Sequence, residues 1–89
     1  MIRIMMKYEV EDFAKWKAGF LAAENIRTAA GAKSAQAFQG ADNPKMVVVL
    51  TEWDSLEKAK SFSQSPALRE AQQKAGVVSK PEVSILEPM

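Results

Sequence analysis

The stretch Met46-Val47-Val48-Val49-Leu50 decides the fold, because it is the longest uncharged apolar run in the chain. Its successive valines favour a β-strand. In an antiparallel sheet with one face in water, apolar and polar residues should alternate. This run does not alternate, so both faces of its strand favour burial. We expect helices to cover one face and a second copy of the chain to cover the other. The alternative is a central strand that tolerates a few exposed valines.

The residues on either side of this strand predict an α+β protein in the order βαββαβ. The other strands are expected over residues 2–8, 33–38 and 82–87, and helices over residues 12–30, 54–64 and 66–75. Residues 40–44, Gly-Ala-Asp-Asn-Pro, form a turn between the two middle strands. Ser65-Pro66 breaks the second helix in two, because serine caps a helix and proline fits its first position. This order is that of the ferredoxin-like fold, an antiparallel sheet with its helices on one face.

Short polar motifs predict where the helices begin and end. Glu11 or Asp12 can cap the first helix, and Gly31 provides the left-handed residue that ends it. Asp54 and Glu57 are spaced as a capping box at the start of the second helix. Each cap supports the assignment of the helix beside it.

Composition excludes several classes of function for the single domain expected over residues 1–89. Twelve basic and eleven acidic residues leave a net charge of +1, which gives no attraction to nucleic acid or to an anionic membrane. The aliphatic third strand also lacks the aromatic residues with which RNA-recognition motifs of the same strand order read bases. The chain has no cysteine and no histidine, so thiolate chemistry and the commonest metal ligand are missing. We expect a cytoplasmic protein without a metal or cofactor.

Three short motifs make the chain similar to the dimeric α+β barrel superfamily, close to its antibiotic-biosynthesis monooxygenase-like domains. They are residues 49–55, Val-Leu-Thr-Glu-Trp-Asp-Ser, residues 65–68, Ser-Pro-Ala-Leu, and Gly76-Val77. The resemblance implies a homodimer with two sheets packed face to face, and a pocket between each sheet and its own helices. Proteins that the chain resembles include cofactor-free quinol oxygenases, haem-degrading enzymes and isomerases.

The catalytic residues of the haem-degrading relatives do not carry over. Those enzymes use an asparagine on the first strand, a tryptophan at the end of the third and a histidine on the following helix. Trp53 matches the tryptophan, but Met6 and Phe62 stand at the other two positions. Without an axial ligand, haem degradation is not expected. The same loss weakens an oxygenation that depends on a histidine base.

The resemblance and the residue pattern together predict a ligand pocket lined mainly by aromatic side chains, with Trp53 as its floor and Phe62 closing it from the helix side. Tyr8 and Arg27 are the candidate polar groups, the first as a hydrogen-bond donor, acid or base and the second as a carboxylate ligand. The alternatives are a filled core, a tyrosine that reaches water, and an arginine placed only by the helix dipole. The candidate pocket residues are Trp53, Phe62, Trp16, Phe20, Met6, Tyr8 and Arg27.

Two functions agree with these residues. The first is binding of a small apolar or aromatic ligand by a homodimer that lacks the catalytic histidine of its relatives. The second is a cofactor-independent monooxygenase or isomerase that acts on an aromatic or quinone-like molecule, with Tyr8 or Arg27 assisting. Glu52 lies outside this pocket by its parity, on the expected dimer face, where it could pair with Arg3, with Lys7 or with a basic group of a second copy of the chain.

Overall fold

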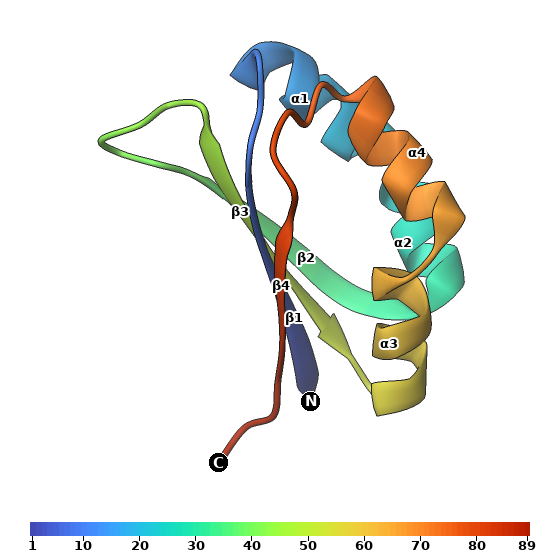
Figure 1. Ribbon diagram of the computed structural model, residues 1–89. Coiled ribbons are helices and arrows are strands. Elements are labelled where there is room, and N and C mark those ends of the chain that lie inside the picture. Colours follow the sequence, from blue (N-terminus) through green and yellow to red (C-terminus); the bar gives the residue numbers. More distant parts are fainter.

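The computed structural model describes residues 1–89 as an antiparallel sheet with all its helices on one face (Figure 1). The order of the strands across the sheet is β2-β3-β1-β4, so β1 and β3 are central. This confirms the ferredoxin-like α+β fold. The elements are β1 (Ile2–Glu9), α1 (Phe13–Ala22), α2 (Glu24–Ala30), β2 (Ala32–Gln39), β3 (Met46–Trp53), α3 (Leu56–Ser63), α4 (Pro66–Lys74) and β4 (Glu82–Leu86).

The two faces of β3 have different surroundings. Val47, Val49 and alternate residues after them are buried beneath the helices. Val48 and Leu50 point to the other face and are only half-buried, because nothing in the chain covers that side of the sheet. On the helix-covered face, Met6 of β1 lies opposite Val49 of β3. The apolar run therefore has two apolar faces, and the chain itself buries one of them.

The first helical segment is two helices, so the single helix expected over residues 12–30 is wrong. The break falls at Ala23, whose N–H donates to the carbonyls of Gly19 and Phe20 at 3.0 and 3.3 Å. The Phe20 carbonyl also accepts a hydrogen bond from Nη1 of Arg27 at 2.9 Å. A side-chain donor on a backbone carbonyl competes with the regular helical ladder. The turn at Ala23 lets α2 change direction and still direct Arg27 inward.

The caps of the first and second helical segments are partly as expected. Asp12 caps α1, since its Oδ1 accepts from the N–H of Ala14 at 3.1 Å. The capping box at Asp54 is wrong, because Ser55 is the N-cap of α3 and accepts from the N–H of Lys58. Helix α3 begins at Leu56, so the carboxylate of Asp54 lies one residue too early. It pairs with Lys33 and Lys58 at 3.6 and 3.5 Å instead.

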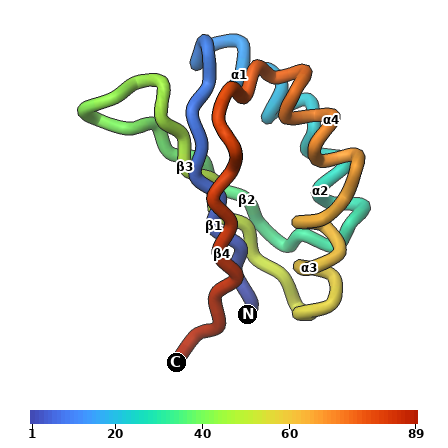
Figure 2. Tube along the Cα trace, viewed as in Figure 1, coloured from blue at the N-terminus to red at the C-terminus, as the bar shows by residue number.

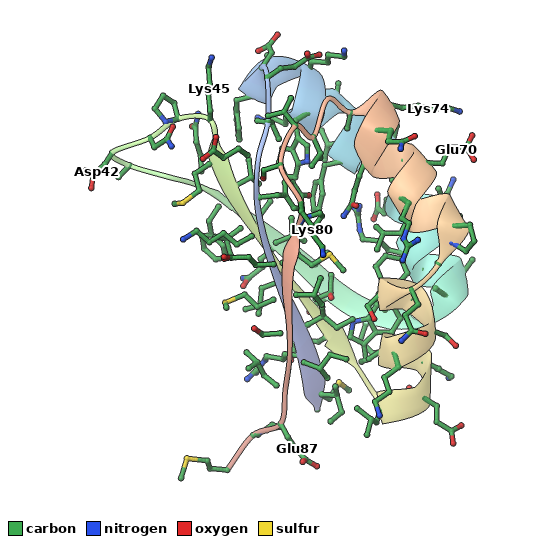
Figure 3. All side chains as sticks on the ribbon, in the orientation of Figure 1. Asp42, Lys45, Glu70, Lys74, Lys80 and Glu87 are labelled. Carbon is green, nitrogen blue, oxygen red and sulfur yellow. The ribbon has the colours of Figure 1, made fainter.

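The break between α3 and α4 is confirmed at Ser65-Pro66. Ser65 accepts from the N–H of Ala67 at 3.2 Å, and Pro66 is in the first turn of α4. Helix α4 contains no fully buried residue. Its Glu70 and Lys74 form an ion pair at 3.1 Å and point away from the sheet (Figure 3). This helix therefore covers the sheet as a thin outer layer.

The core lies between the sheet and the helices, and the opposite face of the sheet is bare. The tube in Figure 2 shows the β2–β3 hairpin projecting from the sheet away from the helices, and Asp42 and Lys45 lie near its tip (Figure 3). Eleven buried hydrophobic residues form one cluster on the helix side. No helix is long and apolar enough to cross a membrane.

Candidate functional site

A small cavity lies between the sheet and the helices, at the place where the pocket was expected. Its volume is about 50 Å³, and 11 of its 15 lining residues are hydrophobic. The sheet provides its base and α1, α2, α3 and α4 provide its walls. The lining residues are Met6, Tyr8, Trp16, Gly19, Phe20, Ala23, Ile26, Arg27, Val49, Thr51, Phe62, Leu68, Ala71, Gln72 and Ala75.

Six of the seven candidate pocket residues border this cavity, and Trp53 does not. Trp53 is completely buried. Its ring packs against Phe62 with 4.9 Å between ring centroids, and its Nε1 donates to the hydroxyl of Thr51 at 2.8 Å. The cavity therefore does not reach Trp53, the residue expected to form the floor of the pocket. Thr51 and Phe62, which both contact Trp53, border the cavity in its place.

The aromatic side chains pack against one another and occupy most of the expected pocket. Trp16 stacks on Phe20 with 5.1 Å between ring centroids and meets the edge of Tyr8 at 6.2 Å. The 50 Å³ that remain compare with about 150 Å³ for a cavity that binds benzene. The space as it stands has room for a few atoms but not for an aromatic ring. A filled core and a small cavity are both present.

The side chain of Tyr8 is buried, and its hydroxyl accepts a hydrogen bond inside the core. It is one of the core residues on β1, and its hydroxyl oxygen accepts from Nε1 of Trp16 at 3.1 Å. Burial raises the pKa of Tyr8, and the hydrogen bond from Trp16 and the charge of Arg27 offset this only in part. A raised pKa keeps the phenol protonated near neutral pH. Tyr8 is thus suited to donate a hydrogen bond and poorly suited to act as a base.

Arg27 is buried on α2, as its place on the apolar helix face indicated. The residue is 9% exposed, and its Cζ lies 3.9 Å from the centroid of the Phe20 ring. Burial lowers the pKa of Arg27, while nearby Glu24 and Tyr8 act in the opposite direction. Arginine stays protonated in proteins under such shifts. A positive charge therefore lies at the wall of an apolar cavity.

Two polar lining residues, Thr51 and Gln72, and the apolar wall that α4 provides were not predicted from the sequence. Thr51 has the same parity as Val49 on β3, which was a usable indication that it faces the helices. Leu68, Ala71 and Gln72 recur at spacings of three and four residues, the spacing of one helical face. The sequence indicates this face only weakly, because Ala71 is small and Gln72 is polar.

Glu52 lies on the bare face of the sheet, away from the cavity. Its carboxylate accepts from Ser34 at 2.6 Å and from Arg3 at 3.3 Å, which confirms the expected pairing with Arg3. The hydrogen bond from Ser34, and secondarily the charge of Arg3, lower the pKa of Glu52. No group of three or more acidic side chains is placed to hold a metal ion.

The family of the chain follows from a comparison of its sequence with known families. Residues 1–74 match the antibiotic biosynthesis monooxygenases. The chain belongs to this family. The match spans β1 to the end of α4, so every residue that lines the cavity, apart from Ala75, lies inside it. No curated protein sequence matches the chain.

Solved structures of monooxygenase-family proteins have the same fold at low sequence identity. A Bordetella bronchiseptica protein assigned to the family superposes with a TM-score of 0.85 at 17% identity, covering 99% of this chain and 96% of its own. SnoaB from Streptomyces nogalater, a cofactor-independent oxygenase, gives a TM-score of 0.81 at 11% identity, covering 99% and 92%. A Caulobacter crescentus protein assigned to the family gives 0.78 at 16% identity, covering 99% and 89%. At these identities the similarity shows the fold alone.

Proposed function

We propose that this monooxygenase-family protein binds a small, largely apolar organic molecule in the cavity between its sheet and its helices. The carrying observation is the cavity itself: a space with an apolar lining and a few convergent polar groups, which is the usual composition of a small-molecule site. Tyr8, Thr51 and Arg27 are those polar groups. They would orient a ligand, and the apolar wall would bind its body.

Helix α4 is the element that can make room for a ligand larger than the present cavity. It buries no residue completely, and it meets the cavity through Leu68, Ala71 and Gln72, which are all half-buried. An element with few buried apolar contacts opens at low free-energy cost. An aromatic ligand would therefore enter by displacing α4 outward, while the Trp53–Phe62 pair stays packed.

Binding of the uncharged probes benzamide and 2-naphthamide tests this function. Trp16 lines the cavity, so a Trp53→Phe protein carries one tryptophan reporter there, and its fluorescence should change saturably with each probe. Ala71→Leu fills the cavity wall and should weaken binding by about tenfold or more. Ala67→Leu is the matched control, because Ala67 lies on the same helix, is exposed and does not border the cavity. No saturable binding, or equal binding by both leucine variants, would contradict the proposal.

A second candidate function is cofactor-independent oxygenation of an aromatic methylene compound, and its support is the family match over residues 1–74. In that reaction a CH₂ group and O₂ give a C=O group and water. The substrate would have to lose a proton, yet no carboxylate lines the cavity and the chain has no histidine. Oxygen uptake with anthrone as the probe, above the rate without protein and lost in Ala71→Leu, would support it. Uptake equal to the spontaneous rate would exclude it for this substrate class.

The homodimer belongs to the same proposal, and the bare sheet face supports it. Val48 and Leu50 are half-buried there, and Phe38 of β2, which pairs with Val48, is 51% exposed. Apolar groups on one face of a small protein favour association with a second copy. The two sheets would then pack face to face, with each cavity on the outer side of its own sheet.

A further inference from the structure

Arg27 carries the one buried side-chain nitrogen or oxygen of the protein that lacks a hydrogen-bond partner. This atom is its Nε. Nη1 donates to the Phe20 carbonyl at 2.9 Å. All five ion pairs of the chain involve other residues, so no carboxylate lies within 4.0 Å of the guanidinium. Arg27 is thus a nine-tenths buried cation with no carboxylate in direct contact, and Glu24 acts on its charge only from a greater distance.

Neither the helix dipole nor aromatic packing explains this burial. Arg27 is in the last turn of α2, where the helix dipole stabilises a cation. An exposed arginine at this position would have the same stabilisation and would also keep its hydration, so the dipole does not account for the burial. Its contact with the Phe20 ring, 3.9 Å from Cζ to the centroid, compensates in part. A buried charge remains costly unless an opposite charge accompanies it. An anion bound beside Arg27 would balance this charge.

Two hydroxyl groups of the cavity lining also have protons without acceptors. The oxygen of Tyr8 accepts from Nε1 of Trp16 at 3.1 Å, and that of Thr51 accepts from Nε1 of Trp53 at 2.8 Å. Each indole N–H takes one lone pair and leaves the hydroxyl proton of Tyr8 or Thr51 free to donate. Neither hydroxyl donates to a group of the chain. The polar part of the lining is thus rich in donors and holds no carboxylate.

We propose that the ligand of this cavity is a small organic acid, bound as a monoanion with its carboxylate against Arg27. This inference rests on the proposed function, because it names the chemical class of the molecule that the cavity binds. Arg27 is the only charged residue in the lining. Its positive charge balances one negative charge on the ligand, and a second negative charge on the ligand would have no partner in the lining. The planar guanidinium suits a carboxylate through parallel hydrogen bonds. Tyr8 and Thr51 supply further donors.

The size of the cavity agrees with a carboxylate as the innermost group of the ligand. A volume of about 50 Å³ exceeds the roughly 30 Å³ that one water molecule takes up in the liquid. It therefore accepts a group of a few heavy atoms without rearrangement. The apolar remainder of the acid would lie toward Leu68 and Ala71 on α4, where the wall is only half-buried.

Arg27 also borders a second depression on the outside of the protein, and the experiment has to separate the two. This depression, of about 230 Å³, lies between α2 and β2 and includes Lys33 and Glu24. The carboxylate of Glu24 would repel an anion there. Anion binding at the outer depression would depend on Lys33 and would be insensitive to Ala71, which lines only the inner cavity.

Benzoate and its uncharged isostere benzamide are the probes, and dissociation constants come from tryptophan fluorescence of the Trp53→Phe protein. We expect this protein to bind benzoate at least about tenfold more tightly than benzamide, the contribution of a charge-assisted hydrogen bond. In Arg27→Met the two constants should become nearly equal. Ala71→Leu should weaken binding of both probes, and Lys33→Gln should leave both unchanged. Arg27→Lys keeps the positive charge but loses the two parallel N–H donors of the guanidinium, so it should reduce the preference for benzoate over benzamide. This variant replaces Arg27→Met in the test if Arg27→Met does not fold.

Each other outcome overturns the inference. If benzamide binds as tightly as benzoate, the cavity takes a neutral ligand, so the proposed function stands and the acid does not. Benzoate binding that survives Ala71→Leu and falls in Lys33→Gln places the anion at the outer depression. If neither probe binds, the proposed function and the inference fail together.

Discussion

At the scale of single residues, Phe62 joins the core to the candidate site. It is 5% exposed, packs against Trp53 and borders the cavity. In the relatives that degrade haem, a histidine stands at the matching position. In this chain the apolar ring at this position contributes to the packing of the core. The candidate polar groups of the cavity are Tyr8, Thr51 and Arg27.

Truncation of Phe62 should therefore be costly. Phe62→Ala removes a buried ring beside Trp53, and we expect it to lower the free energy of unfolding by about 3–5 kcal/mol. The measurement is urea unfolding at a constant protein concentration, because an associating protein has a concentration-dependent stability. Leu21→Ala, at a position that is 60% exposed, is the control and should cost less than about 0.5–1 kcal/mol. A small loss for Phe62→Ala would mean that the cavity continues beneath this ring.

The buried phenol of Tyr8 predicts a loss of stability at alkaline pH. Burial raises its pKa above the ordinary tyrosine value of about 10, so the folded protein holds this proton more tightly than the unfolded chain. The resulting stability is complete below pH 10 and is lost as the pH rises through the raised pKa of the folded state. Tyr8 is the only tyrosine, so absorbance of the tyrosinate reports it directly. Tyr8→Phe should remove this part of the pH dependence; identical alkaline profiles for the two proteins would contradict a raised pKa.

At the scale of the elements, the helices differ in how firmly they attach to the sheet. Helix α3 buries Ala59 and Phe62, whereas α4 buries no residue completely. A close contact joins α1 and α4, since a Cβ built on Gly19 would lie 2.9 Å from that of Ala75. This contact attaches the C-terminal end of α4 to α1, and the side chain of Ser65 caps the N-terminal end of α4. Between these ends, Leu68, Ala71 and Gln72 lie over the cavity and are only half-buried.

Hydrogen exchange should show α4 to be the least protected helix of comparable length. Amides of residues 68–74 should exchange through local opening, well before those of α3, because little buried apolar surface has to be exposed. Benzoate should slow the exchange of α4 selectively if this helix covers the ligand. Equal protection of α3 and α4 would show that α4 opens only with the whole protein, and would exclude it as the route of entry.

At the scale of the whole molecule, the layered arrangement leaves the sheet covered on one side only (Figure 1). Val48, Leu50 and Phe38 lie on the uncovered side, and a chain of 89 residues has a thin core of its own. Face-to-face association would bury both apolar surfaces at once. The polar cluster of Glu52, Arg3 and Ser34 would lie at the same interface.

The homodimer is tested by placing a charge on the bare face. Wild-type protein at micromolar concentration should sediment at twice the 9.8 kDa of the chain. Val48→Asp should dissociate or unfold it, because an unpaired charge at a buried interface costs several kcal/mol, in order of magnitude. Val78→Asp is the matched control, since Val78 is 62% exposed and lies outside the sheet, and it should remain dimeric. A wild-type protein that sediments only at 9.8 kDa would refute the dimer.

The sequence by itself determined the order of the elements and the two apolar faces of β3. These depend on local rules that the residues carry: alternation along a strand, apolar spacing along a helix, and caps such as Asp12, Ser65 and Gly31. It also placed Arg27 and Tyr8 on the side of the core. The periodicity of a helix or strand is enough to assign a side chain to one face.

Only the tertiary structure decided which of those inward residues meet at the cavity. The break at Ala23 depends on the bond from Arg27 to the Phe20 carbonyl, a contact that arises when α2 packs on the sheet. Ser55 displaced Asp54 as the cap because the exact start of α3 depends on the backbone after β3. Trp53 does not line the cavity, because Thr51 and Phe62 pack against it and border the cavity in its place. Packing sums many small contacts across distant segments, and no local pattern contains that sum.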